Sequence, residues 1–155
     1  MAYDLEKMGI IPNKSFKTRF PFEIDPSLYR HVFRGIIDGD GSVQSGIKYT
    51  PKDNKNRFYH SISCCGTHRL MSEMLKYIKE NLDLRTNITV YDYKNKSLSE
   101  FKISLYEDVG IFGRWIYEDS RIFLKRKEEK FNDIVNYYGL NYNRPLFEDS
   151  LFGIQ

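Results

Sequence analysis

The protein has 155 residues, 41% hydrophobic and 15% aromatic, which suits one domain with a substantial core and excludes a disordered chain. Its formal net charge of +3 is only mildly basic, so any surface for nucleic acid must be a local patch. The sequence has no apolar run long enough to span a bilayer, no secretory signal and no spaced cysteine pair, since Cys64 and Cys65 are adjacent. We therefore expect an intracellular protein, in the cytoplasm or an organelle matrix, that is not secreted and binds no membrane.

Residues 1–25 are the least domain-like part of the chain. Gly9, Pro12 and Pro21 interrupt this stretch, and a basic run extends from Lys14 to Arg19. We interpret it either as a connector or as an N-terminal extension packed on the surface of the domain.

A helix is predicted from Pro26 to about Asp38. Asp25 can accept hydrogen bonds from the free amides at its start, and a proline at the first helical position sacrifices none. Small and apolar residues share one face of this helix: Leu28, Val32, Gly35, Ile36 and Gly39. Because two glycines remove side chains from that face, another backbone can approach it, and we expect tight packing against a partner helix.

Two carboxylates mark the end of this helix, where Asp38 and Asp40 alternate with Gly39 and Gly41. The negative end of the helix dipole disfavours an anion by a few tenths of a kcal/mol to about 1 kcal/mol. Acids concentrated at such a point indicate a bound cation. Asp-Gly pairs also form ordinary turns, and the tetrapeptide alone leaves both interpretations open.

The nonapeptide from Phe33 to Gly41, FRGIIDGDG, resembles the LAGLIDADG motif of homing endonucleases. Five positions match the motif letters: Gly35, Ile37, Asp38, Asp40 and Gly41. Four positions differ: Phe33, Arg34, Ile36 and Gly39. The resemblance implies that Asp40 binds a catalytic divalent metal together with the backbone carbonyl at Gly39, and that Asp38 braces the helix end. It implies Mg²⁺ as the cofactor, with Mn²⁺ or Ca²⁺ able to substitute for binding.

Residues 9–21 are similar to the segment that precedes the second motif in two-domain members of that family. This similarity implies a connector over residues 1–25 and descent from the C-terminal half of a longer ancestor. The alternative of a surface extension stays open.

A hairpin is predicted after the motif, with strands over 42–49 and 57–65 and a polar turn between them. One side of its second strand carries Phe58, His60, Ile62 and Cys64, and the other side is mixed polar and basic. Thr67 then caps a helix that runs to about Leu82, with a methionine-containing stripe that we interpret as core.

A second hairpin is predicted from strands over 87–93 and 98–105. A short helix around 109–116 follows, made imperfect by Gly110 and Gly113. A longer amphipathic helix, with Leu124 at its start and Tyr138 near its end, stops at Gly139. Residues 141–155 show no usable period, and we interpret them as a C-terminal tail.

This order of elements is the α-β-β-α-β-β-α order of one LAGLIDADG domain. We therefore predict an α+β fold of that type with an antiparallel DNA-binding sheet, occupying residues 26–140. The motif occurs once, and members with one motif dimerise through their motif helices. The resemblance thus implies a homodimer whose interface contains Leu28, Val32, Gly35, Ile36 and Gly39.

The resemblance also implies further catalytic residues, and each assignment has an alternative. The family places a basic residue near the scissile phosphate, at a position matched here by the run 124–127, and Lys125 is the first choice. The alternative is a solvated basic helix turn paired with Glu128 and Glu129. A polar residue after the second strand positions solvent in the family, and here Thr67 or His68 occupies that place; neither is the glutamine that some members use.

The two hairpins are the candidate DNA-binding surface, because a twisted antiparallel ribbon fits the major groove. The expected DNA-binding residues are Ser42, Gln44, Lys48, Lys52, Lys55, Arg57, Tyr59, Ser61, Ser63, Thr89, Tyr91, Tyr93 and Lys102. The resemblance implies a site-specific endonuclease that cuts double-stranded DNA as a homodimer. Two other functions remain open: a non-cleaving DNA-binding regulator on the same fold, and an RNA maturase that assists intron splicing.

Overall fold

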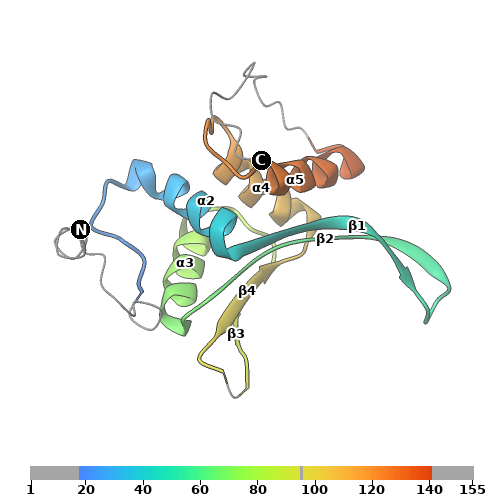
Figure 1. The fold of residues 1–155 in the computed structure, drawn as a ribbon, viewed down its shortest axis with the longest axis horizontal. Helices are drawn as coiled ribbons and strands as arrows, with labels where there is room; N and C mark the ends of the chain where they lie inside the picture. The colour runs from blue at the N-terminus through green and yellow to red at the C-terminus, as the bar shows by residue number, and fades with distance from the viewer. Residues whose placement is uncertain (1–17, 95, 141–155) are drawn as a thin grey trace.

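The computed structural model describes residues 18–94 and 96–140, and Figure 1 shows its fold. A short 3₁₀ helix, η2 (Pro26–Leu28), leads into α2 (Tyr29–Asp40) and a hairpin of β1 (Gly41–Thr50) and β2 (Lys55–Gly66). Next come α3 (His68–Asn81), a smaller hairpin of β3 (Val90–Asp92) and β4 (Ser99–Ile103), and finally α4 (Tyr106–Tyr117) and α5 (Lys125–Tyr138). The interpretations of residues 1–17 and 141–155 lie outside the described residues.

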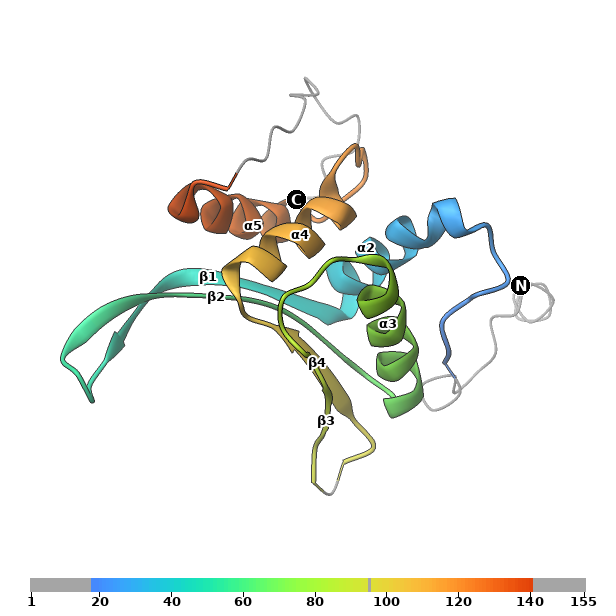
Figure 2. The ribbon, with the colours of Figure 1, turned by 180° about the vertical axis from the view of Figure 1, so that it is seen from behind.

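The four strands form one antiparallel sheet in the order β1-β2-β4-β3. The β1–β2 pairing runs from Gly41 opposite Cys64 to Thr50 opposite Lys55, and β4 pairs with the inner half of β2. The helices lie on one side of this sheet, while the two hairpins extend away from them in different directions (Figures 1 and 2). Among the described residues, no helix covers the opposite side of the sheet.

The predicted elements all occur, with shifted ends. Asp25 caps η2 by accepting a hydrogen bond from the Ser27 amide at 2.9 Å, but α2 continues to Asp40 instead of ending near Asp38. Strands β1 and β2 are longer than predicted, and β3 and β4 are shorter. Thr67 caps α3 through the Leu70 amide at 3.2 Å, and α5 ends as predicted at Gly139, whose φ of 61° is left-handed.

Helix α4 is longer than predicted, and its glycines do not break it. A Cβ atom on Gly113 would lie only 2.1 Å from Cε2 of Phe131, so the bare backbone makes room for a ring from α5. A Cβ on Gly110 would lie 2.8 Å from Cδ1 of Leu140. These glycines therefore serve close helix packing, which a sequence pattern cannot distinguish from helix breaking.

The hydrophobic core lies between the sheet and the helices. From the sheet it takes the fully buried Ile62, Phe101 and Ile103, and α3 contributes the predicted stripe that includes Met71 and Met74. Burial of this apolar surface is the main force that holds the helices on one side of the sheet. Within the described ranges, no helix is long and apolar enough to cross a membrane.

Part of the predicted N-terminal extension belongs to this core. Phe20 is 1% exposed, and its backbone amide donates to Oε2 of Glu73 on α3 at 2.8 Å. Its ring lies 5.2 Å from that of Tyr29 and 4.8 Å from that of Phe33, centroid to centroid. Residues 18–25 therefore dock between α2 and α3 through aromatic packing.

We predict that Gly113→Ala lowers the free energy of unfolding by about 1–3 kcal/mol, because the new methyl group must displace a buried ring. Gly110→Ala is the matched control, since the atom that it meets is the movable end of a leucine side chain. Its cost should stay below about 1 kcal/mol, offset by the better helix propensity of alanine. Urea unfolding of the three proteins measures the difference, and equal stabilities for both variants would contradict the packing role of Gly113.

Candidate metal-binding motif and nucleic-acid interface

One buried lysine from α5 holds the C-terminal end of α2. The Nζ atom of Lys127 donates hydrogen bonds to the backbone oxygens of Ile37, Asp38 and Gly41 at 2.7, 2.7 and 2.6 Å. These bonds use all three N–H donors of an ammonium group. Since free carbonyls give a helix end partial negative charge, the ammonium stabilises that end and offsets the two carboxylates beside it. This contact explains why α2 stays helical through Asp40.

The charges around Lys127 oppose one another. Burial, together with the neighbouring charge of Arg126, lowers the pKa of Lys127, whereas the carboxylates of Asp38 and Asp40 favour its charged form. The thiol of Cys64 is buried in the same place, and burial raises its pKa to about 12. At neutral pH the thiol is therefore uncharged and adds no negative charge to the two carboxylates.

Asp38 faces the interior and braces the segment that enters α5. Its Oδ1 accepts a hydrogen bond from the Tyr117 hydroxyl at 2.9 Å, and its Oδ2 accepts one from the Leu124 amide at 2.8 Å. Burial raises the pKa of Tyr117, which keeps this hydroxyl protonated as a donor. Both carboxylate oxygens are thus occupied by structural bonds, in agreement with the interpretation of Asp38 as a brace.

Asp40, in contrast, is exposed as the last residue of α2. Among the residues that the structure describes, none donates a hydrogen bond to its carboxylate. The carbonyl of Gly39 lies beside it in the last helical turn, where carbonyls lack partners within the helix. The available ligands at this point are therefore a free carboxylate and a backbone oxygen.

These oxygen atoms suit a hard cation such as Mg²⁺. Across residues 18–94 and 96–140, however, no group of three or more His, Cys, Asp or Glu side chains could hold a metal ion. One copy of the chain thus offers part of a coordination sphere. A metal held by Asp40 needs further oxygens from water, from a phosphate or from a second copy.

The other predicted catalytic residues lie elsewhere. Lys125 begins α5 with a side chain that is 78% exposed, 4.0 Å from Glu129, as in the alternative of a solvated basic turn. Thr67 caps α3 and donates to the Thr18 carbonyl at 3.3 Å. His68 contacts Asp92 at 2.7 Å. The structure brings Lys127, rather than Lys125, to the motif, and the catalytic roles of Lys125 and Thr67 stay predictions.

Two residues at the motif were missed by the sequence analysis. Lys127 is four residues before the buried Phe131, so its place on the buried face of α5 could have been inferred from the helical period. Arg34, which replaces an alanine of the motif, is 7% exposed and donates to the carbonyls of Ile116 and Ile122, each at 2.8 Å. This arginine ties α2 to the end of α4 and to the segment between α4 and α5, and nothing in the local sequence indicates those two carbonyls.

The sheet side without helices carries most of the predicted DNA-binding residues. Residues opposite one another in the strand register share a side: Ser42 with Ser63, Gln44 with Ser61, Gly46 with Tyr59, Lys48 with Arg57, and Thr50 with Lys55. Lys102 lies opposite Ser63, and Glu100 lies opposite both Cys65 and Tyr91. We call these residues the polar face. Asp40 directly precedes β1, so this exposed residue lies where α2 passes into the first strand of this face.

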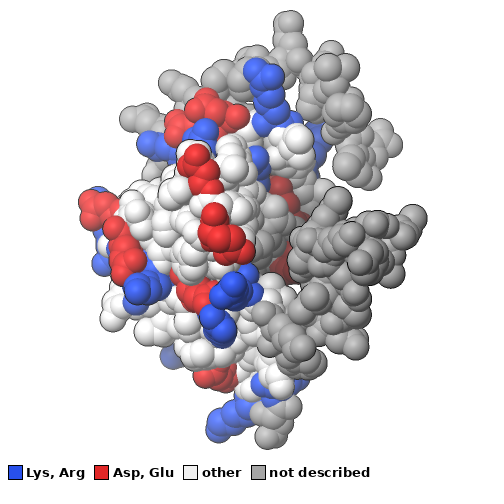
Figure 3. Space-filling model, turned by 90° about the vertical axis from the view of Figure 1, so that its left-hand side faces the viewer, with Lys and Arg blue, Asp and Glu red and all other residues white. Residues whose placement is uncertain are grey.

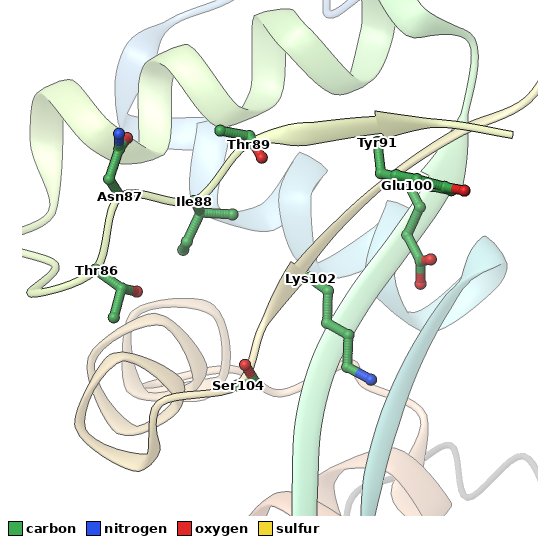
Figure 4. A pocket seen from close by; sticks show the side chains of 8 residues that line it. All are labelled: Thr86, Asn87, Ile88, Thr89, Tyr91, Glu100, Lys102 and Ser104. Carbon is green, nitrogen blue, oxygen red and sulfur yellow. The ribbon is translucent and has the colours of Figure 1, made fainter.

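The remaining predicted DNA contacts flank this face. Thr89 lines a hollow of about 300 Å³ together with Tyr91, Glu100 and Lys102 (Figure 4). The Tyr93 hydroxyl donates to Glu100 at 2.5 Å. Lys52 lies exposed in the turn between β1 and β2. The structure thus gathers the predicted residues along one surface that follows both hairpins.

Not every residue of the polar face is accessible. Ser61 is 1% exposed and Ser63 is 7% exposed, so these short side chains cannot contact DNA unless longer neighbours move. Above them the Tyr59 hydroxyl accepts a hydrogen bond from Lys102, which lowers the pKa of Tyr59. The Nζ atoms of Lys102 and Lys48 lie 5.0 and 6.0 Å from the centre of the Tyr59 ring.

The polar face differs in charge from other surfaces of the protein. Where α2 and α3 face the viewer in Figure 3, acidic and basic side chains are interspersed, and pairs such as Arg69 with Glu73 lie 2.8 Å apart. The strand residues of the polar face include four cations, Lys48, Lys55, Arg57 and Lys102, and one acid, Glu100, and of these cations Arg57 forms an ion pair with Asp53 of the turn. A local excess of positive charge on one face fits binding to phosphate backbones.

Within the described part of the chain, one side of η2 and α2 is uncovered, small and apolar. Leu28 is 48% exposed, and Val32 and Ile36 are half-buried. Gly35 and Gly39 are exposed, and within the described part of the chain no atom lies within 4 Å of where a Cβ atom would stand on either. The five residues predicted for a helix contact therefore remain available to a partner.

Several solved structures of DNA-bound proteins are similar to this one. The archaeal intron-encoded homing endonuclease I-Vdi141I, complexed with DNA, matches with a TM-score of 0.56 and 21% identity, over 76% of this chain and 72% of that chain. The homing endonuclease I-CvuI, in complex with a DNA target, gives a TM-score of 0.50 and 17% identity over 68% of this chain. The LAGLIDADG meganuclease I-AabMI, bound to uncleaved DNA, gives 0.50 and 20% identity over 72% of this chain.

The chain has the LAGLIDADG homing-endonuclease fold. This result confirms the predicted fold class and supports the resemblance seen in the nonapeptide. The chain spans 62% of the length of I-CvuI and 39% of that of I-AabMI. No protein-family model and no curated protein sequence matches the chain.

The LAGLIDADG fold of this chain depends on Lys127 in a way that can be measured. We predict that Lys127→Met lowers the free energy of unfolding by about 1–3 kcal/mol, because the methionine stem fills the space but donates no hydrogen bond to the three carbonyls that Lys127 contacts. Lys125→Met is the control from the same helix turn, and its exposed side chain predicts a change within about 0.5 kcal/mol. Urea unfolding measures both, and an equal effect of the two substitutions would contradict the role of Lys127.

Proposed function

We propose that this protein is a site-specific double-strand DNA endonuclease that acts as a homodimer with a divalent metal. The observation that carries the proposal is the position of Asp40, an exposed acid where α2 passes into the first strand of the polar face. A carboxylate beside a cationic surface opposes phosphate binding unless it holds a cation there. The DNA complexes of I-Vdi141I and I-CvuI, which share the fold, support a DNA ligand.

The proposed dimer rests on α2, the helix that carries Asp40. One motif per chain gives one free carboxylate, whereas cutting both strands of a duplex requires two attack sites. If the exposed glycines of two α2 helices meet on a two-fold axis, Asp40 of each copy comes close to the axis, and the polar faces of both copies extend outward along the DNA. Two carboxylates near one another favour a bound cation.

In this arrangement each group has a separate task. Asp40 and the Gly39 carbonyl would hold Mg²⁺, which supplies activation of a water molecule and stabilisation of the leaving 3′ oxygen in phosphodiester hydrolysis. Lys127 and Asp38 fix the backbone on either side of these ligands. Lys48, Arg57 and the turn residue Lys52 provide sequence-independent affinity for phosphates, and Gln44 is positioned to contact base edges.

We predict that Asp40→Asn abolishes cleavage of both strands while specific DNA binding survives, because the amide keeps the shape but loses the charge that holds the metal. The target is selected from a randomised duplex pool, and binding and cutting are measured on the same DNA with Mg²⁺ and with Mn²⁺. Asp83→Asn, an exposed acid after α3, is the control. A wild-type protein that binds its selected site but never cuts it would favour the DNA-binding regulator instead.

We predict that Gly35→Leu separates the dimer, because a leucine side chain cannot fit where two helix backbones touch. Within the described structure of one chain the position is open, so the monomer should still fold. Sedimentation velocity measures the mass, and Lys76→Leu on α3 controls for an added leucine at an exposed helix position. A wild-type protein that stays monomeric with and without DNA would contradict the homodimer.

A further inference from the structure

Glu100 is the acidic residue among the β-strand residues of the polar face. It lies opposite Cys65 on β2 and Tyr91 on β3, two positions from Lys102 on its own strand. The sequence analysis assigned Lys102 to DNA contact and passed over Glu100, although strand alternation gives both the same side. A carboxylate among cations that bind phosphates needs a separate explanation, since it repels the DNA backbone.

The carboxylate of Glu100 is held in place by one hydrogen bond. The Tyr93 hydroxyl donates to its Oε2 at 2.5 Å, and this bond raises the pKa of Tyr93 to about 12, so the hydroxyl remains a donor. Within the described residues, Glu100 lies in no ion pair with a lysine or arginine. Lys102 donates to Tyr59 instead. One carboxylate oxygen is therefore oriented by Tyr93, and the other stays available as an acceptor.

The surroundings of Glu100 form a shallow site. A hollow of about 300 Å³ is lined by Thr89, Tyr91, Glu100, Lys102 and four further residues between Thr86 and Ser104. In Figure 4 the side chains of Glu100 and Lys102 project from the same side of β4 toward this open region. A base edge that entered it would meet an acceptor from Glu100 beside a cation from Lys102.

We propose that Glu100 reads a cytosine in each half of the DNA target. An ionised carboxylate can only accept hydrogen bonds, and in the major groove cytosine presents the N4 amino group as a donor. Guanine and thymine present acceptors there and are repelled, and adenine sets its N7 acceptor beside its amino group. Cytosine is thus the base from which the carboxylate can accept a hydrogen bond without facing a lone pair of the same base.

This inference rests on the proposed function, because it requires that the polar face binds duplex DNA. The experiment selects target sites from a randomised duplex pool without Mg²⁺, using the full-length wild-type protein and the Glu100→Gln variant, followed by sequencing. We expect the wild type to prefer cytosine at one position of each half-site by about 5- to 150-fold. We expect Glu100→Gln to lose that preference in favour of adenine, which glutamine contacts through N6 and N7, with all other positions unchanged.

Two further variants distinguish recognition of a base by Glu100 from a general effect of charge and from a loss of folding. Glu80→Gln removes the same charge from α3, where the side chain is 59% exposed, and should leave every base preference unchanged. Tyr93→Phe removes the donor that orients Glu100, and should weaken the cytosine preference without shifting it to adenine. Thermal melting of each variant verifies that the protein is folded.

The outcomes are distinguishable. The proposal for Glu100 is overturned, while DNA binding stands, if the cytosine preference persists in Glu100→Gln. It is also overturned if the wild-type protein selects a site in which no position prefers cytosine. A wild-type protein that selects no sequence at all overturns the proposed function and this inference together.

Discussion

The ammonium group of Lys127 at the end of α2 is the contact on which the rest of the site depends. A helix that ends in two carboxylates is electrostatically unfavourable, and the three hydrogen bonds from one buried cation offset that cost. With this end fixed, Asp38 can turn inward to Tyr117 and Asp40 can turn outward to solvent. Two identical side chains, two residues apart, thereby acquire opposite roles.

The fixed helix end also sets the geometry of the sheet. Because β1 begins at the residue after Asp40, the orientation of α2 determines where the long β1–β2 hairpin starts. Its inner half is covered by helices on one side, while its outer half extends beyond them, which leaves Ile47 74% exposed on the side where Val43 is buried. Among the described residues, the same arrangement that buries the core thus leaves the polar face without a covering helix, although Ser61 and Ser63 lie buried beneath longer side chains.

Local patterns predicted the elements and the fold, because helix caps, strand alternation and the nonapeptide are properties of adjacent residues. Thr67 and Gly139 were identified as helix ends for this reason. The long-range contacts could not be obtained in that way. The two carbonyls to which Arg34 donates lie 88 and 82 residues away, and Gly113 resembles a helix breaker in the sequence although it makes room for the ring of Phe131. Lys127 is intermediate, since the helical period could have placed it on the buried face, whereas the carbonyls that it contacts could not be inferred from the sequence.

The central claim is that two copies of this chain join their single motifs to cut one duplex. Sequencing of the ends produced when the wild-type protein digests a randomised duplex pool with Mg²⁺ tests it most directly, because the ends report strand cleavage and site symmetry together. The account predicts cuts in both strands within a site whose two halves are inverted repeats of one another. Cuts in one strand only, or an asymmetric site without repeated halves, would contradict it.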